Sequence, residues 1–217
     1  MRIHEVAQGS PEWFQARTGA ITASMFSEVR KRLKSGPNKG DWSSAAHDYA
    51  FTLAFERLTG TPLDEGQYET WAQKRGHELE PEARVTHEFE WGLQVDVAGF
   101  IASECGRFGA SADGLIEDEG GVEYKCFVAP SKLRTILLSG DISEHYDQIQ
   151  GGMWLTGRQW WHFGLYCPTL DPIGKALTIF PIDRDESYIE ALKEDLEAFD
   201  TLVEQYKELL ANRSVAN

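Results

Sequence analysis

Three charged residues stand at a spacing suited to chemistry at a metal ion, because Asp113, Glu123 and Lys125 form the pattern D-x9-E-x-K. The residues between the two acids predict a β-hairpin, with the apolar pair Leu115-Ile116, an acidic tip, and Gly120-Gly121 before the next strand. Such a hairpin can bring Asp113 and Glu123 side by side. Two adjacent carboxylates repel each other unless a cation lies between them, so the pattern predicts a cation site.

The residue types indicate which cation and which reaction this site would serve. Hard oxygen ligands that leave room for water suit Mg²⁺ or Mn²⁺. On a strand, Glu123 and Lys125 point to the same face, so the ammonium lies beside the cation and can orient or deprotonate a water. This is the equipment for metal-assisted hydrolysis of a phosphodiester. The alternative is a surface hairpin with a salt bridge, since the pattern also arises by chance in acidic proteins.

Length and composition set the class of protein. A chain of 217 residues with 41% hydrophobic residues and seven Trp is expected to form a single globular domain over residues 1–217. The cysteines Cys105, Cys126 and Cys167 show no C-x-x-C spacing, which disfavours a zinc ribbon or a cysteine-ligated iron–sulfur cluster and fits a reducing cytoplasm. We expect neither a signal peptide nor a membrane span, since no stretch approaches about 20 apolar residues.

The net charge of −14 disfavours nucleic acid as a partner, but the charge is unevenly spread. Residues 183–212 hold ten acids against three bases, a difference of −7, whereas residues 1–60 hold six acids against eight bases, or +2. Much of the acid therefore falls on a predicted C-terminal helix at about 186–211. That helix is by default a solvated outer face, with a subunit contact or a partner site left open. A basic groove elsewhere is compatible with DNA.

Hydrophobic periodicity and turn residues predict a layered fold in which helices flank a sheet. Ser10 followed by Pro11 predicts the start of the first helix. Helices are expected at about 10–17, 22–33, 44–59, 68–91, 130–138, 144–156 and 186–211, and strands near 93–103, 107–116, 121–127, 159–167 and 176–182. The fold class is therefore α/β (α+β), with a central mixed sheet of about five strands.

Four blocks of sequence together resemble a known family. They are WFQARTGAITAS, RGHELEPEAR, SADGLIEDEGGVEYKCF and HYDQIQGGMWLTGRQWWHFGLY, spread over roughly residues 10–205. In order and spacing they resemble lambda exonuclease and the YqaJ-type viral recombinases of the PD-(D/E)xK nuclease superfamily. The resemblance implies a restriction-endonuclease-like core. Ala112 stands where the superfamily's name has proline, a position that shapes a turn and does not bind metal.

The resemblance also implies roles for individual residues. It places the active site at Lys125, Glu80, Gln150, Asp113 and Glu123. Of these, Asp113 and Glu123 would bind one or two Mg²⁺ or Mn²⁺ ions together with the main-chain oxygen of Tyr124. Lys125 would orient or deprotonate the attacking water. Glu82, on the same predicted helix as Glu80, is expected to face solvent.

A second group of residues matches those that grip the terminal 5′ phosphate of DNA in this family. Arg17 can bind a phosphate through two parallel hydrogen bonds. Ser24, near a predicted helix N-terminus, adds a hydroxyl, and Ser111 can add another. Trp13 lies one helical turn before Arg17 and can stack on the DNA end or pack under the arginine. The alternatives are an Arg17 that serves the helix dipole and a Trp13 that serves the core.

The activity implied by the resemblance is a metal-dependent 5′-to-3′ double-strand DNA exonuclease. It would release mononucleotides and leave 3′ single-stranded tails for recombination by strand annealing. The implied partners are DNA ends, two further copies of the chain in a homotrimeric ring, and a single-strand annealing protein, all in the cytoplasm of a bacterial or phage-infected cell. Two alternatives are a restriction-like or structure-selective endonuclease, and a non-catalytic DNA-binding module.

Overall fold

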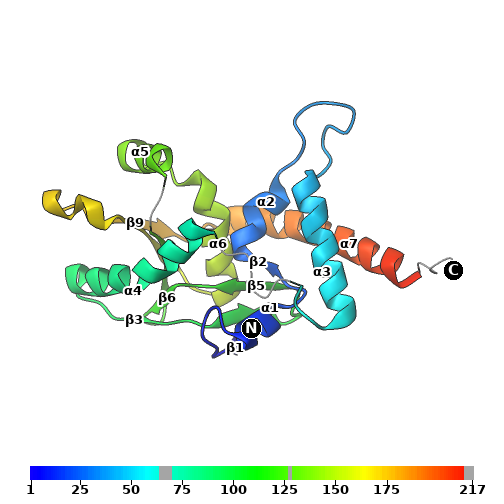
Figure 1. Cartoon of the computed structure of the whole chain (residues 1–217), viewed down its shortest axis with the longest axis horizontal. Coiled ribbons are helices and arrows are strands. Elements are labelled where there is room, and N and C mark those ends of the chain that lie inside the picture. The colour runs from blue at the N-terminus through cyan, green and yellow to red at the C-terminus, as the bar shows by residue number, and fades with distance from the viewer. Residues whose placement is uncertain (64–69, 127–128, 213–217) are drawn as a thin grey trace. The chain divides into compact units, whose positions relative to one another are not determined.

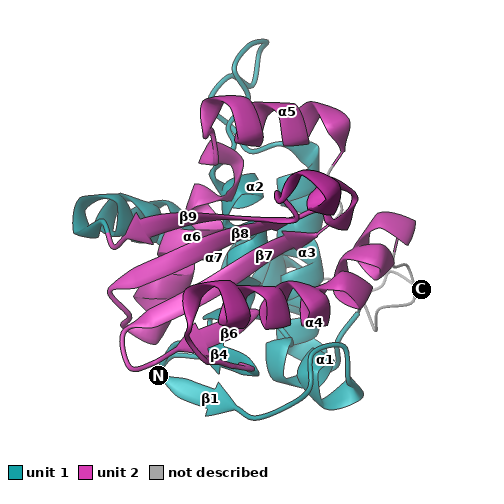
Figure 2. Ribbon diagram, turned by 90° about the vertical axis from the view of Figure 1, so that its left-hand side faces the viewer, with its two compact units in different colours: residues 1–65, 99–111, 185–217 teal, residues 66–98, 112–184 magenta. Residues whose placement is uncertain are grey.

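The computed structural model describes residues 1–63, 70–126 and 129–212. The chain divides into two compact units, which are coloured separately in Figure 2 and whose elements are labelled in Figure 1. Unit 1 comprises residues 1–65, 99–111 and 185–217, and unit 2 comprises residues 66–98 and 112–184. Each unit has its own sheet and is described by itself. A single domain over residues 1–217 stays a prediction.

Unit 2 is built on a five-stranded mixed sheet in the order β3-β6-β7-β8-β9 (Figure 2). The strands are β3 (Val95–Asp96), β6 (Gly114–Ile116), β7 (Gly120–Cys126), β8 (Trp160–Tyr166) and β9 (Leu177–Asp183). Strands β7 and β8 are parallel, and the other neighbours in this sheet are antiparallel. The predicted mixed sheet of about five strands is therefore confirmed. Phe127, expected at the end of β7, lies outside the described residues.

Helices cover both faces of this sheet. Figure 2 shows α4 (Trp71–Trp91) on one side and α6 (Ser143–Thr156) on the other. Leu79 and Ala83 of α4 share an apolar cluster with Val122 and Tyr124 of β7. Because side chains alternate along a strand, Glu123 and Lys125 project toward the opposite face, where α6 packs. The remaining helices of unit 2 are α5 (Pro130–Ser139) and the short 3₁₀ helix η2 (Pro168–Ile173).

The predicted hairpin is present as β6 and β7. The register pairs Gly114 with Val122 and Ile116 with Gly120. Glu117 at the tip adopts a positive φ of 47°, which tight turns require and which is uncommon for a residue other than glycine. Since Gly114 pairs with Val122, the residues one step beyond them, Asp113 and Glu123, come to the same end of the hairpin.

Unit 1 contains a second sheet that the sequence did not predict, in the order β1-β4-β5-β2. Its strands are β1 (Arg2–His4), β2 (Ile21–Thr22), β4 (Phe100–Ala102) and β5 (Phe108–Ser111). The strands expected at 93–103 and 107–116 are each divided between the two sheets. At Gly99 an added Cβ would lie 1.9 Å from the carbonyl oxygen of His4, so the close approach of β1 to the chain before β4 depends on a residue without a side chain.

The helices of unit 1 are α1 (Pro11–Arg17), the short 3₁₀ helix η1 (Ala23–Met25), α2 (Phe26–Arg30), α3 (Ser44–Thr59) and α7 (Glu186–Asn212). The side chain of Ser10 caps α1 by accepting a hydrogen bond from Trp13 N, as predicted. The long α7 packs against α2 and α3. A stripe of buried side chains that includes Leu192, Leu196 and Phe199 makes this contact, so the acidic helix also supplies part of the core.

The helix expected at about 22–33 is shorter than predicted. It consists of η1 and the five-residue α2, and it ends at Arg30. Trp42 from the following loop explains the early end, because its indole N–H donates to the carbonyl of Val29 at 3.0 Å. The guanidinium of Arg32 lies 3.6 Å from the centre of the Trp42 ring, and the two residues form an isolated β-bridge. These contacts replace the next helical turn.

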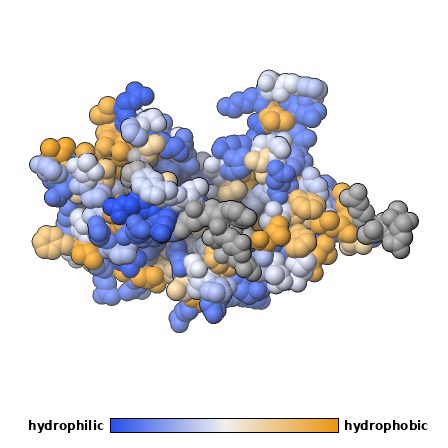
Figure 3. All heavy atoms as spheres, viewed as in Figure 1, coloured by the Kyte–Doolittle hydropathy of each residue, from blue (hydrophilic) through white to orange (hydrophobic). Residues whose placement is uncertain are grey.

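Several large apolar side chains are exposed. On α4, Trp71 is 68% exposed and Phe89 is 88% exposed, whereas Leu79 and Ala83 are buried. On α3, an exposed apolar stripe consists of Phe51, Phe55 and Leu58. Figure 3 shows apolar side chains gathered on the visible face over α3. Among the described helices, none is long and apolar enough to cross a bilayer.

Candidate functional site

The second half of β7 and the residue before β6, both in unit 2, bring together the three residues of the D-x9-E-x-K pattern. Asp113 Oδ2 accepts a hydrogen bond of 2.6 Å from the main-chain N–H of Tyr124. Lys125 Nζ lies 2.6 Å from Glu123 Oε1. The hairpin therefore holds Asp113 against the β7 main chain and places the ammonium of Lys125 on the carboxylate of Glu123.

Glu80 joins this group from α4. Its carboxylate interacts electrostatically with those of Glu123 and Asp113 and with the ammonium of Lys125. The structure thus brings Glu80 to the residues of the hairpin, as the sequence block RGHELEPEAR led us to expect. We refer to Glu80, Asp113, Glu123, Lys125 and Gln148, described next, as the carboxylate cluster.

The glutamine of the cluster is Gln148, whereas the family resemblance implied Gln150. Gln148 Nε2 donates to Glu123 Oε1 at 2.6 Å, and Gln148 Oε1 accepts from Lys125 Nζ at 3.3 Å. The buried Gln150 donates instead to the main-chain oxygen of Asp183 at 2.9 Å. Side chains two positions apart on an α-helix point about 200° apart around its axis, so only one of these two glutamines can face β7. The structure therefore places Gln148, and not Gln150, beside Glu123 and Lys125.

Burial and like charge shift the pKa values in the carboxylate cluster. Burial, followed by repulsion from Glu123 and Glu80, raises the pKa of Asp113 well above its usual range, although Lys125 and the Tyr124 N–H oppose the shift. Burial also raises the pKa of Glu80. For Lys125 burial alone would lower the pKa, but the attraction of Glu123 and Asp113 raises it. The cluster thus holds carboxylates that favour a positive charge among them.

A buried hydrogen-bonded chain lies behind the cluster. The hydroxyl of Tyr124 lies 2.8 Å from His87 Nδ1, and His87 Nε2 lies 3.0 Å from His162 Nδ1. Burial and then the neighbouring His162 lower the pKa of His87 to about 4, so the pair is neutral near neutral pH. The main chain of Tyr124 donates to Asp113 while its side chain is fixed in the core, so this residue of β7 is held at both its main chain and its side chain.

The donor atoms can be tested against the expected metal. Within residues 1–63, 70–126 and 129–212, no set of three or more His, Cys, Asp or Glu side chains is arranged as a metal site. The cluster instead offers the carboxylates of Asp113 and Glu123. In an extended strand the N–H and C=O of one residue point to the same side, so Tyr124 directs its oxygen toward Asp113 as well. Two carboxylates and a carbonyl fit Mg²⁺, which keeps several waters.

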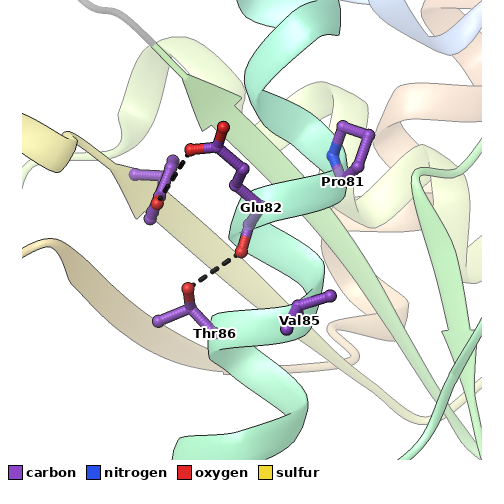
Figure 4. A pocket seen from close by; sticks show the side chains of 5 residues that line it. Pro81, Glu82, Val85 and Thr86 are labelled. Carbon is purple, nitrogen blue, oxygen red and sulfur yellow. Dashed lines mark hydrogen bonds between the residues drawn. The ribbon is translucent and has the colours of Figure 1, made fainter.

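Glu82, two residues from Glu80, lies outside the cluster. It lines a shallow hollow together with Pro81, Val85, Thr86 and Tyr166 (Figure 4). The hydroxyl of Tyr166 donates to Glu82 Oε2 at 3.4 Å, and Thr86 Oγ1 donates to the Glu82 carbonyl at 2.8 Å. The exposed Glu82 agrees with the expectation that it faces solvent. None of the cluster residues lines this hollow.

Unit 1 brings together the residues predicted to bind a 5′ phosphate. The guanidinium of Arg17 lies 3.9 Å from the centre of the Trp13 ring. The indole N–H of Trp13 donates to Ser111 Oγ at 2.9 Å. Of the two roles expected for Trp13, the structure thus has it packed under the arginine, where it supports the guanidinium through a cation–π contact.

Hydroxyl groups complete this second group. Arg17 Nη2 lies 3.5 Å from Thr22 Oγ1, which in turn lies 3.3 Å from Ser24 Oγ. The Tyr49 hydroxyl accepts a hydrogen bond of 3.1 Å from Thr22 N. We call Trp13, Arg17, Thr22, Ser24 and Ser111 the Arg17 cluster. Because α2 has only five residues, the expected binding of a phosphate here would rest on the arginine and the hydroxyls rather than on a helix dipole.

Sequence reasoning missed Gln148, Thr22 and Tyr49. A signal existed for Gln148, since Gln148 and Gln150 both lie in the block HYDQIQGG, and helical spacing from the buried Ile149 and Met153 separates their faces. Thr22 stands in the block WFQARTGAITAS beside the chosen Ser24. Tyr49 is remote in sequence from Thr22, so no local pattern connects the two.

The protein has a mixed α/β fold, with helices on both faces of its five-stranded sheet. A cluster of carboxylates and one lysine lies at the end of the β6–β7 hairpin. The model of the YqaJ-like viral recombinase domain matches residues 12–159, and the chain belongs to this family. No curated protein matches the sequence.

Among solved structures, the chain is similar to the alkaline exonuclease LHK-Exo from Laribacter hongkongensis. The structure of LHK-Exo in complex with dAMP is 33% identical with a TM-score of 0.79, and the match covers 93% of this chain and 96% of that one. A phage-related exonuclease from Haemophilus somnus is 18% identical, with a TM-score of 0.66 over 90% of this chain and 96% of that one, and shares the fold. Family and relatives together indicate a nuclease.

Proposed function

We propose that this protein is a metal-dependent 5′-to-3′ exonuclease of double-stranded DNA. The observation that carries the proposal is the contact of Lys125 with Glu123 and Gln148, at 2.6 and 3.3 Å. Asp113 lies beside them, hydrogen-bonded to the main-chain N–H of Tyr124. A lysine set among carboxylates is suited to phosphodiester hydrolysis. Membership of a family with an exonuclease relative supports the same activity.

Asp113, Glu123 and the carbonyl of Tyr124 would hold Mg²⁺ or Mn²⁺, as one or two ions. The ion, when bound, lowers the pKa of water and offsets negative charge that develops on the phosphate. The chain's own contribution is to keep these oxygens in place. The hydrogen bond from Tyr124 N to Asp113 fixes one carboxylate, and the hydrogen bond from Gln148 fixes the other. Glu80 adds a third carboxylate that can hold a second ion or accept a proton from water.

Lys125 and Gln148 would act directly on the reacting groups. The ammonium of Lys125 is held by Glu123 and can orient the attacking water or steady a phosphate oxygen. The raised pKa of Lys125 favours the charged form, which suits an orienting and charge-stabilising role better than that of a general base. The amide of Gln148 can donate to the phosphate without adding charge.

The Arg17 cluster would bind the 5′-terminal phosphate of the strand being degraded. Arg17 provides a planar donor pair for phosphate oxygens, and Ser24 is exposed beside Thr22. Trp13 supports the guanidinium from below, and Ser111 fixes the indole. Binding of the terminal phosphate would fix which phosphodiester bond lies at the carboxylate cluster, so that one mononucleotide is released at a time. The dAMP in the related LHK-Exo structure is a deoxynucleoside monophosphate, which is the product expected here.

The wider role follows from the activity and the family. Removal of 5′ strands would leave 3′ single-stranded tails, the substrate of a strand-annealing protein in recombination. We further propose that residues 1–217 act as one nuclease domain in the cytoplasm, and that three copies form a ring around the duplex. The exposed stripe of Phe51, Phe55 and Leu58 on α3 is a candidate subunit contact, because solvent-facing apolar patches favour association. Light scattering coupled to gel filtration tests the stoichiometry.

The decisive experiment is digestion of linear duplex DNA in Mg²⁺, with either 5′-phosphoryl or 5′-hydroxyl ends and with a label at one 5′ or one 3′ end. We expect early release of the 5′ label as a mononucleotide, with 5′-phosphoryl ends preferred. Lys125→Ala should abolish release, and Arg17→Ala should remove the end preference. Lys132→Ala is the matched control, since this exposed lysine of unit 2 pairs with Glu144 outside the cluster.

Closed circular DNA separates the alternatives. Cutting of the circle by the wild-type protein would favour a restriction-like or structure-selective endonuclease. Binding to duplex DNA without cleavage in either Mg²⁺ or Mn²⁺ would favour a non-catalytic DNA-binding module. Early release of the 3′ label would contradict the proposed polarity while leaving the nuclease activity intact.

A further inference from the structure

Two neighbouring residues of α3 hold both main-chain polar groups of Gly19. Glu56 Oε2 accepts a hydrogen bond of 2.7 Å from Gly19 N, and Arg57 Nε donates to Gly19 O at 2.8 Å. Gly19 lies between Arg17 at the end of α1 and Thr22 in β2. Glu56 and Arg57 therefore grip the link between the two halves of the Arg17 cluster, although neither residue belongs to it.

The two α3 side chains are themselves fixed. Arg57 Nη2 lies 2.8 Å from Asp200 Oδ1, and Arg57 Nη1 lies 2.9 Å from Glu204 Oε1, both on α7. Asp200 is 3% exposed, and its other oxygen accepts from Arg107 Nη1 at 2.5 Å. Glu56 is also buried. A buried carboxylate with several charged partners is a rigid anchor, because loss of one partner leaves an uncompensated charge.

The chain from Arg17 to Thr22 is held at almost every residue. Ala20 N donates to Arg17 O at 2.9 Å, and Ile21 N donates to Arg107 O at 2.8 Å. The next amide, that of Thr22, is bound by Tyr49. These hydrogen bonds restrict the distance between Arg17 and Thr22, as a site for a compact tetrahedral anion requires.

Gly19 itself cannot be replaced without moving the anchor. Its φ of 72° lies in the left-handed region, and an added Cβ would lie 2.7 Å from Arg57 Cγ. A side chain at this position would thus strain the backbone and displace Arg57 together. The glycine is required by the close approach of the arginine, which links the backbone conformation after α1 to the ion pairs of α7.

We propose that Glu56 and Arg57 are positioning residues for recognition of the 5′-terminal phosphate. They act through Gly19 by fixing Arg17 relative to Thr22 and Ser24, and they do not touch the DNA. This inference rests on the proposed function, because it assumes that the Arg17 cluster binds that phosphate. Under this inference, the preference for a 5′ phosphate depends on the ion pairs that connect Arg57 of α3 to Asp200 and Glu204 of α7.

The test compares kcat/KM on duplexes with 5′-phosphoryl and 5′-hydroxyl ends for the wild type, Glu56→Gln, Arg57→Lys and Gly19→Ala. The first two substitutions are conservative in size, so they loosen the grip on Gly19 with little loss of volume. We expect each to reduce the preference for the 5′-phosphoryl end about tenfold or more, through a higher KM on that substrate. The rate on 5′-hydroxyl ends should stay close to that of the wild type.

Val203→Ala is the control for a general loss of stability, because Val203 is a fully buried residue of α7 that makes none of the anchor contacts. It should lower the melting temperature and keep the end preference. Folded Glu56→Gln and Arg57→Lys variants that retain the wild-type preference would overturn the inference and leave the proposed function standing. A wild type that digests both ends equally would instead remove the proposed phosphate recognition. If Gly19→Ala fails to fold, the two conservative variants decide.

Discussion

Gln148 and Gln150 lie on opposite sides of α6 and serve different partners. Gln148 bridges Glu123 and Lys125, whereas Gln150 is buried and donates to the main-chain oxygen of Asp183. The amide of Gln148 thus belongs to the carboxylate cluster, and the amide of Gln150 connects α6 to the last residue of β9. Two residues of the same type in one helix form a natural pair for separating catalysis from stability.

Substitution of the two glutamines should give opposite results. Gln148→Ala is expected to lower kcat about a hundredfold with little change in melting temperature, because it removes a donor beside the phosphate. Gln150→Leu should lower the free energy of unfolding by roughly 1–3 kcal/mol, since it leaves the Asp183 carbonyl without its donor. Steady-state kinetics and urea unfolding of both variants check this. A large loss of kcat in folded Gln150→Leu with none in Gln148→Ala would contradict it.

Removal of the charge at Asp113 should separate activity from stability in the reverse direction. Asp113→Asn keeps an acceptor for Tyr124 N but removes repulsion from Glu123 and Glu80. In chelator we expect the variant to be more stable than the wild type by roughly 1 kcal/mol, with nuclease activity lost. Thermal unfolding in chelator is the measurement. Asp118→Asn at the exposed hairpin tip is the control, and equal gains in both variants would refute the explanation.

Trp13 should contribute to end preference through Arg17. Trp13→Leu removes the ring beneath the guanidinium, which is expected to cost about 1 kcal/mol and so about fivefold in preference for 5′-phosphoryl ends. Trp13→Phe keeps a ring but loses the hydrogen bond to Ser111, so its effect should be smaller. The ratio of kcat/KM on the two kinds of end is the readout. An unchanged ratio in Trp13→Leu would show that the stack is irrelevant.

The buried pair His87 and His162 should make the protein sensitive to acid. The pKa of His87 is lowered from 6.5 to about 4 in the folded protein, so the unfolded chain binds more protons below pH 6.5. The free energy of unfolding is therefore unaffected by His87 above that pH, and it falls by up to about 3 kcal/mol as the pH falls toward 4.

Urea unfolding between about pH 7 and pH 4.5 measures this dependence. His87→Gln should be less stable than the wild type at the upper end of the range but should lose less stability on acidification. A slope equal to that of the wild type would assign the acid sensitivity to other groups.

Short-range sequence patterns correctly predicted the elements that form from residues close together in the chain. The hairpin of Asp113 and Glu123 followed from its apolar pair and glycines, and the start of α1 followed from Ser10 and Pro11. The parts that failed depend on residues far apart in the sequence. Trp42 binds the carbonyl of Val29 near the end of α2, and β4 pairs with β1 from the start of the chain.

The same distinction applies to the site. Spacing alone placed Lys125 beside Glu123, and the family blocks indicated Glu80 and Arg17. Choosing between Gln148 and Gln150 required the orientation of α6, and the part played by Tyr49 required the packing of α3 in unit 1. An exposed Trp71 or Phe89 likewise has the periodicity of a core residue, because helical spacing cannot distinguish the core from an exposed apolar surface.

The position of Asp200 late in the sequence determines when its ion pairs can form during synthesis of the chain. This carboxylate balances Arg57 and Arg107, and it lies on α7, which is synthesised after every other described element of unit 1. A nascent chain therefore carries both guanidinium groups without their shared counterion until residue 200 has left the ribosome. Arg57, which binds the main chain of Gly19, gains its partners on α7 only then, so the proposed phosphate site would be the last part of unit 1 to be completed.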